Sequence, residues 1–211
     1  MATTRTTAAE TETAIRWNKG IAVAVGILFF FQLITFLIGS SLIQTYLDGE
    51  ADRTTLTLGV VLEMLAGLAV VAIGLLMYRV LKVVDRKWAL GYPIMRVLEF
   101  TVSALLAAYL LSQLQEFPNH LLWVYIPTAI GGVILNYLFF TSRIVPRPIA
   151  ILGLFIYVLL LLVVVLDLVG AVEEGSGTGL ALLLPGALYE FVILPIWLIA
   201  KGFRRPVATV A

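Results

Sequence analysis

The feature that most constrains this chain is a series of six stretches, each nearly free of charge and long enough to cross a lipid bilayer. A membrane-spanning helix needs about 20 mainly apolar residues. The 211 residues therefore hold six spans joined by short connections. The predicted spans are residues 20–43, 56–80, 89–114, 121–141, 148–168 and 179–200. We predict an all-α integral membrane bundle of six transmembrane helices.

Composition indicates the same class of protein. The mean hydropathy is +1.04 and only 13% of the residues are charged, whereas about 25% are charged in soluble domains. A single transmembrane domain, residues 17–205, accounts for most of the chain, and residues 1–16 are predicted to form a disordered cytoplasmic tail. A signal peptide is the alternative for the N-terminal segment. Its apolar core would be about 7–15 residues long, and the uncharged run from Gly20 to Leu47 is longer.

The distribution of basic residues predicts the orientation. Of the 14 Lys and Arg residues, Arg53 lies at one end of the predicted bundle and Arg96 lies inside it. The rest flank the other end. They are Arg5, Arg16, Lys19, Arg79, Lys82, Arg86, Lys87, Arg143, Arg147, Lys201, Arg204 and Arg205. Because basic residues concentrate on the cytoplasmic side, we expect a multi-pass protein of the cell membrane with both termini cytoplasmic.

Four ionisable residues lie well inside the predicted spans. They are Glu63, Arg96, Glu99 and Glu190. A charge at the centre of a bilayer costs roughly 3 kcal/mol or more. Each of these side chains must therefore face protein, water or an opposite charge.

Helical spacing predicts that Glu63 points into the bundle. Gly59, Glu63, Gly67 and Gly74 follow one another at intervals of four or seven residues, which places them on one stripe of a helix. Small residues let the backbones of membrane helices approach closely. We therefore expect this stripe to form a helix contact that carries Glu63.

The third predicted span carries an acid and a base one helical turn apart. Arg96 and Glu99 can neutralise one another at this spacing, and we expect Arg96 to pair with Glu99, with Glu190 or with both. Depths estimated at about 1.5 Å per residue would let this group share a region with other polar residues if the third, fourth and sixth spans are adjacent. The candidates for a buried polar site are Glu63, Arg96, Glu99, Glu190, Asn136, Tyr137 and Gln32.

Two further spans have distinct features. The fifth span has little polarity beyond Tyr157, and we expect it to be the most peripheral helix. The sixth span contains Pro185 and Pro195. Because proline removes a backbone donor and clashes with the preceding turn, we expect this span to be distorted or kinked.

The sequence lacks the residues that several enzyme chemistries require. There is no cysteine, which excludes disulfides and thiolate ligands, and the single histidine, His120, falls in a predicted loop. None of the GxSxG, HExxH, Walker A and GxGxxG motifs is present. The three buried glutamates could bind a hard cation, but their spread in depth argues against a compact metal site. We expect no cofactor, no metal and no nucleic-acid partner, and an enzyme is the less favoured class.

Several segments resemble a known family. They are LGVVLEMLAGLAVV followed by YRVLK, then GYPIMRVLEF, SRIVPRPIAILG and YEFVILPIWLIAKGF. Together they are similar to the bacterial and archaeal membrane family called domain of unknown function 4386, over about Trp17 to Arg204. The resemblance implies a six-span integral membrane protein, and it implies no activity. The residues that match the family's polar positions are Glu63, Arg96, Glu99, Arg143 and Glu190.

Two classes of function fit these observations. The first is a small carrier in which the buried Glu and Arg groups bind a cation, a proton or a polar solute. The second is a sensory, scaffolding or lipid-interacting module in which the buried charges are structural. In this second class four cytoplasmic arginines meet the anionic headgroups of the bilayer. These lipid-headgroup candidates are Arg143, Arg147, Arg204 and Arg205. The absence of a clear repeat between the two halves weakens the carrier hypothesis.

Overall fold

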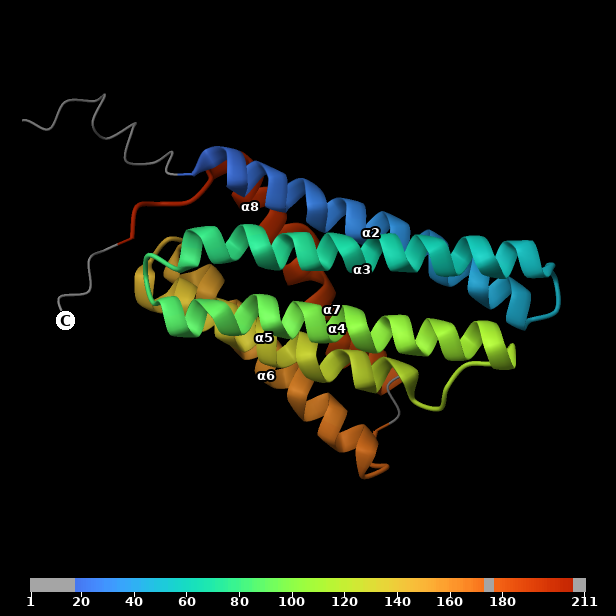
Figure 1. Ribbon diagram of the computed structural model, residues 1–211. Coiled ribbons are helices and arrows are strands. Elements are labelled where there is room, and N and C mark those ends of the chain that lie inside the picture. The colour runs from blue at the N-terminus through green and yellow to red at the C-terminus, as the bar shows by residue number, and fades with distance from the viewer. Residues whose placement is uncertain (1–17, 173–176, 207–211) are drawn as a thin grey trace, which may run out of the picture.

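The computed structural model describes residues 18–172 and 177–206, which form a bundle of long helices (Figure 1). The first five spans are α2 (Lys19–Leu47), α3 (Arg53–Leu81), α4 (Arg86–Gln113), α5 (His120–Ser142) and α6 (Arg147–Leu168). The sixth span consists of α7 (Gly177–Leu188), the π-helical turn η1 (Tyr189–Ile193) and α8 (Leu194–Lys201). Six helices are long and apolar enough to cross a membrane, which confirms the predicted all-α bundle. The predicted tail, residues 1–16, lies outside the described residues.

The helices form a closed ring. Each of the six spans packs against the next one along the chain, and α8 returns to pack against α2. In Figure 1, α3 and α4 lie side by side, with α2 above them and the tilted α6 below. Lys19 joins the two ends of the ring, because its ammonium group donates hydrogen bonds to the carbonyl oxygens of Ile199 and Ala200. One side of every span therefore faces the common interior of the ring.

The outer surface of the ring is apolar. Large hydrophobic side chains are exposed along the outside, among them Leu105, which is 67% exposed, and Phe155, which is 64% exposed. The buried core is also mainly apolar, but it holds Tyr92, Tyr157 and Tyr189 as well. The buried polar side chains include Arg96, Glu99 and Asn136. Because lipid tails are as apolar as these exposed side chains, the outer surface suits a bilayer and the polar groups are left for the interior.

The expectation that the fifth span is peripheral is wrong. Helix α6 packs against α5 on one side and against α7 and η1 on the other, as the ring requires. Its Gly153 and Tyr157 face inward, and Tyr157 is buried. The single tyrosine gave little indication of this position in the sequence. Gly153 has no side chain, which lets α6 approach Asn136 of α5 and Tyr189 of η1 closely.

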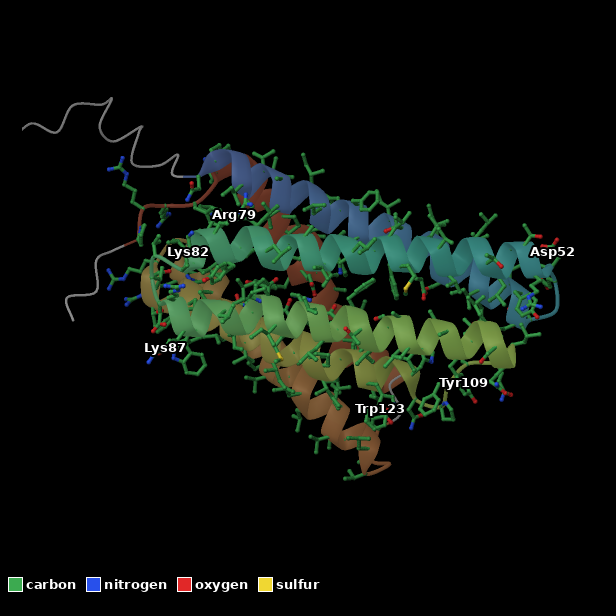
Figure 2. All side chains as sticks on the ribbon, viewed as in Figure 1. Asp52, Arg79, Lys82, Lys87, Tyr109 and Trp123 are labelled. Carbon is green, nitrogen blue, oxygen red and sulfur yellow. The ribbon has the colours of Figure 1, made fainter. Side chains whose placement is uncertain are left out.

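The two ends of the bundle differ in charge. Figure 2 shows Arg79, Lys82 and Lys87 at one end and Asp52 at the other. Asp52 caps α3 by accepting hydrogen bonds from the backbone N–H and the hydroxyl of Thr55, both at 3.0 Å. These hydrogen bonds lower the pKa of the Asp52 carboxyl below its ordinary value. Such caps satisfy backbone donors that the first turn of a helix leaves free.

Candidate functional site

A buried arginine shared by two glutamates lies at the middle of the ring. Nη1 of Arg96 is 2.7 Å from Oε2 of Glu99, and its Nη2 is 3.5 Å from Oε1 of Glu190. The Arg96 side chain is only 1% exposed. Glu99 lies on the same helix, whereas Glu190 comes from the π-helical turn of the sixth span. The pairing predicted for Arg96 is therefore confirmed, and we call these three residues the charged triad.

Two neighbours hold the Arg96 side chain in place. The guanidinium carbon lies 5.1 Å from the centre of the Tyr92 ring, one turn earlier on α4. On the opposite helix, a Cβ atom added at Gly74 would approach the Cβ of Arg96 to 3.1 Å. The small residue on α3 thus makes room for the stem of the arginine, and the aromatic ring provides a face for its positive charge.

The position of Glu190 depends on the π-helical turn. The backbone N–H of Leu194 donates to the carbonyl of Tyr189, five residues earlier, instead of four. The next residue is Pro195, which has no N–H and interrupts the regular ladder of hydrogen bonds. The expected distortion of the sixth span therefore takes the form of a π-bulge. Such bulges often occur at functional sites, and this one carries an acidic side chain toward Arg96.

A second group of polar contacts adjoins the charged triad. The hydroxyl of Tyr189 donates a hydrogen bond to Oδ1 of Asn136, whose Nδ2 donates to the carbonyl of Gly132 at 2.8 Å. The rings of Tyr157 and Tyr189 meet edge to face with their centres 6.2 Å apart. Asn136, a candidate from the sequence, is thus bonded to the residue that precedes Glu190. The role of Tyr189 was missed, and its position next to Glu190 was the only signal for it.

Two buried polar atoms at this site have no hydrogen-bond partner among the described residues. They are Nε of Arg96 and the hydroxyl of Tyr92. Both belong to side chains that are almost fully buried. Buried polar groups are almost always paired, so these two groups are available to bind water or a polar ligand.

Glu63 lies outside the charged triad, and Gln32 forms no side-chain hydrogen bond through its buried oxygen among the described residues. Glu63 accepts a hydrogen bond of 2.7 Å from the hydroxyl of Ser40, where α2 and α3 approach closely through Gly39 and Gly59. Gln32 lies near the middle of α2, and its Oε1 is buried without a partner among the described residues. The contacts of Glu63 are those of a side chain in a helix interface, as expected from its small-residue stripe.

The inclusion of Tyr137 in the interior site is wrong. Its side chain is 44% exposed, and its ring packs against Trp88 with the centres 5.7 Å apart. Successive residues of a helix point about 100° apart, so Tyr137 must face away when its neighbour Asn136 faces inward. The depth estimate placed both residues at one level but did not separate their directions.

The charged triad contains two acidic groups and one basic group, so its charges do not cancel. With all three groups ionised, it carries one net negative charge in a low-dielectric interior, where an uncompensated charge is costly. No group of three or more His, Cys, Asp or Glu side chains in the described ranges is arranged to hold a metal ion. One added positive charge would therefore neutralise a fully ionised triad.

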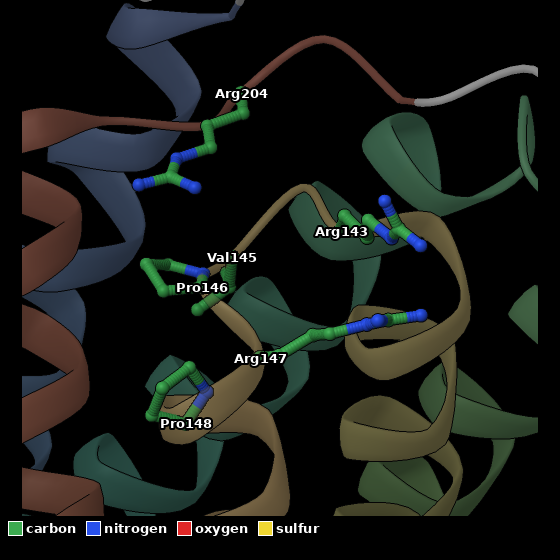
Figure 3. A pocket seen from close by; sticks show the side chains of 6 residues that line it. All are labelled: Arg143, Val145, Pro146, Arg147, Pro148 and Arg204. Atoms are coloured by element: carbon green, nitrogen blue, oxygen red, sulfur yellow. The ribbon is translucent and has the colours of Figure 1, made fainter.

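The arginines predicted to meet lipid headgroups lie at the end of the bundle that carries Arg79, Lys82 and Lys87, which we call the basic end. Arg143, Arg147 and Arg204 line a surface pocket of about 220 Å³ between the α5–α6 turn and the segment after α8 (Figure 3). Arg205 follows in the chain and is exposed. This pocket and the charged triad lie in different parts of the molecule, one at an end of the ring and one near its middle.

Fold and site together define a class: a bundle of six apolar helices, each of spanning length, around a buried ion-paired triad. The family described as domain of unknown function DUF4386 matches residues 20–115 and 102–202. The chain therefore belongs to this family, as the sequence resemblance indicated. No curated protein and no solved structure matches it.

Proposed function

We propose that this protein is a small carrier, embedded in the cell membrane, whose charged triad takes up and releases one positive charge. The observation that carries the proposal is that one buried guanidinium is shared by carboxylates from two different spans. A proton or a small cation would bring the net charge of the triad from minus one to zero. Binding at mid-bilayer between separate helices is the arrangement that carriers commonly use.

The sixth span supplies the part of the site that can move. Glu190 is held by Arg96 at 3.5 Å, a longer contact than the 2.7 Å between Arg96 and Glu99. Glu190 also lies on a turn where the helical hydrogen-bond ladder is already interrupted. We infer that Glu190 is the carboxylate that exchanges its partner, while Arg96 and Glu99 stay paired on α4.

A proton-flux measurement tests this proposal. Purified protein is reconstituted into liposomes that contain a pH-sensitive dye, and a potassium diffusion potential drives proton entry. We expect wild-type flux above that of empty liposomes, and Glu190→Gln should abolish it because Gln cannot gain and lose a proton. Folding should survive, since the neutral Arg96–Glu99 pair remains.

Glu63→Gln is the matched control, because it makes the same chemical change in a span but outside the charged triad. We expect its flux to stay near the wild-type value. The carrier proposal is wrong if wild-type liposomes behave like empty ones in repeated tests with protons, alkali cations and small polar solutes. It is equally wrong if both glutamine variants retain full flux.

We also propose that the basic end of the bundle faces the cytoplasm. Support comes from the position of Arg79, Lys82 and Lys87 at one end and Asp52 at the other, together with the preference of Lys and Arg for the cytoplasmic side. Both chain termini would then lie in the cytoplasm, because Lys19 and Ala200 meet at this same end.

Single cysteines test the orientation cleanly, because the chain has none of its own. Glu50 and Lys87 are both exposed and lie at opposite ends of the bundle. We expect Glu50→Cys to react with a membrane-impermeant maleimide on intact cells, and Lys87→Cys to react only after the cells are opened. The reverse pattern would invert the proposed orientation.

A second candidate function is a lipid-interacting module without transport. The observation in its favour is the pocket at the basic end, which three exposed arginines line. In this case the charged triad would only fix the positions of α4 and the sixth span. Glu190→Gln would then be silent in any activity, and the flux experiment separates the two candidates.

A further inference from the structure

We propose that the pocket at the α5–α6 turn is a binding site for a phosphate group. It is lined by Arg143, Arg147 and Arg204, and the rest of its lining is Val145, Pro146 and Pro148. Its volume of about 220 Å³ far exceeds the roughly 10–15 Å³ that one water molecule requires. The proposal is independent of transport, because none of these residues belongs to the charged triad.

The walls of the pocket are held together by segments far apart in the sequence. The backbone N–H of Arg204 donates to the carbonyl of Ile144 at 2.9 Å, which ties the segment after α8 to the α5–α6 turn. Ile144, Val145 and Phe203 are fully buried beneath this contact. The backbone beneath the pocket is therefore held in place, and two of its arginines come from the turn while the third comes from the segment after α8 (Figure 3).

The arginines of the pocket are not committed to acidic partners. Within the described part of the chain, Arg143, Arg147 and Arg204 form no ion pair. Instead, the guanidinium carbon of Arg147 lies 5.3 Å from the centre of the Phe140 ring. The guanidinium carbon of Arg204 lies 5.7 Å from the centre of the Trp197 ring. Such contacts use the flat face of the guanidinium. They leave the N–H groups at its edge free to bind oxygen atoms.

The backbone contributes little to this site, so the arginines must supply the attraction. The first turn of α6 would ordinarily offer free N–H groups to an anion, but Pro146 and Pro148 have none. A guanidinium group is suited to phosphate oxygens, which it can bind in pairs. The proline and valine floor is apolar, which favours a phosphate attached to an organic group over an isolated ion.

A phosphate of this kind has two sources, the headgroup of an anionic lipid and a soluble phosphate. The basic end lies next to the headgroup region, where anionic lipids attract Lys and Arg. The shared chemistry is a phosphate group that approaches the α5–α6 turn from the surface. The experiment must therefore contain one arm for each source.

Binding to purified full-length protein in detergent tests the proposal. Native mass spectrometry compares phosphatidylglycerol with phosphatidylcholine, and calorimetry titrates inorganic phosphate at constant ionic strength. We expect a clear preference for phosphatidylglycerol. Arg147→Gln and Arg204→Gln should each weaken its binding by about tenfold or more, the usual effect of losing a charge-assisted hydrogen bond.

Two further variants keep the test specific. Arg143 has a φ of 58°, a conformation that Asn adopts more readily than most residues, so Arg143→Asn removes the charge without straining the turn. Arg86→Gln removes an exposed arginine from the same end of the bundle but outside the pocket. It should change the affinity by less than about twofold, since distant surface charges are largely screened. Melting temperatures verify that each variant is folded.

Each result decides the proposal. Selective binding of phosphatidylglycerol without binding of inorganic phosphate supports a lipid headgroup site. Displacement of the lipid by inorganic phosphate supports a site for soluble phosphates. The proposal is overturned if neither ligand binds, or if Arg86→Gln weakens binding as much as Arg147→Gln does, because the effect is then one of overall charge.

Discussion

Replacing Arg96 with leucine is expected to lower the free energy of unfolding by about 3–5 kcal/mol, the usual cost of removing one partner from a buried ion pair. Glu99 and Glu190 would both lose the guanidinium that they share inside the ring. The loss is measured by denaturing the purified protein with SDS in mixed micelles and following its helical circular dichroism. A shift of this size would be among the largest for any single residue in the chain.

Two controls test whether the loss of stability comes from the buried carboxylates that Arg96→Leu leaves without a positive partner. Arg86→Leu removes an exposed arginine from the same helix and should change the stability by less than about 0.5 kcal/mol. Replacing Arg96, Glu99 and Glu190 together with leucine should restore most of the lost stability, because apolar replacement of a complete buried ion group is often neutral or stabilising. A triple variant as unstable as Arg96→Leu would show that lost packing, and not charge, explains the effect.

Gly153→Ala is expected to be among the most damaging changes that add a single methyl group. The new Cβ atom would collide with Oδ1 of Asn136 and with the hydroxyl of Tyr189. Overpacking of this kind costs about 1–3 kcal/mol, and the hydrogen bond between these two side chains would be lost as well, at about 1–3 kcal/mol for each buried polar group left unpaired. The same SDS titration measures the change.

Gly186→Ala is the matched control on the sixth span. Its new Cβ atom would lie 3.4 Å from the Cγ2 of Ile156, an ordinary contact. Alanine in a helix should then stabilise by roughly 0.5–1 kcal/mol relative to glycine. In an Asn136→Ala background, Gly153→Ala should be less harmful, because the colliding atoms of Asn136 are gone and only the Tyr189 hydroxyl remains. Equal costs in both backgrounds would contradict this account of the site.

Part of the site was predictable because it depends on spacing within one helix. Arg96 and Glu99 are three residues apart, and this spacing brings them together in any helix that contains both. The need to compensate Arg96 also followed from the cost of a charge at bilayer depth. What remained undecided was whether Glu190 would join them, because that depends on how the third and sixth spans lie relative to each other. The structure brings Glu190 to the guanidinium.

The residues misplaced by sequence reasoning share one cause. Tyr137 lies at the depth of Asn136 but points outward, and Tyr157 was assigned to a peripheral helix although it is buried in the ring. Depth along a span follows from counting residues. The direction of a side chain relative to the bundle axis depends on which neighbours its helix has, and this is decided by packing between spans.

The sequence alone determined the class of the protein, since the length and apolarity of each span are local properties and a helix satisfies its own backbone hydrogen bonds in a bilayer. It also determined that the buried charges must be paired. Tertiary structure decided the closure of the ring through α8 and α2 and the partners of Arg96. It likewise decided the π-helical turn that presents Glu190. These features require contacts between spans distant in sequence, which no pattern within a single helix contains.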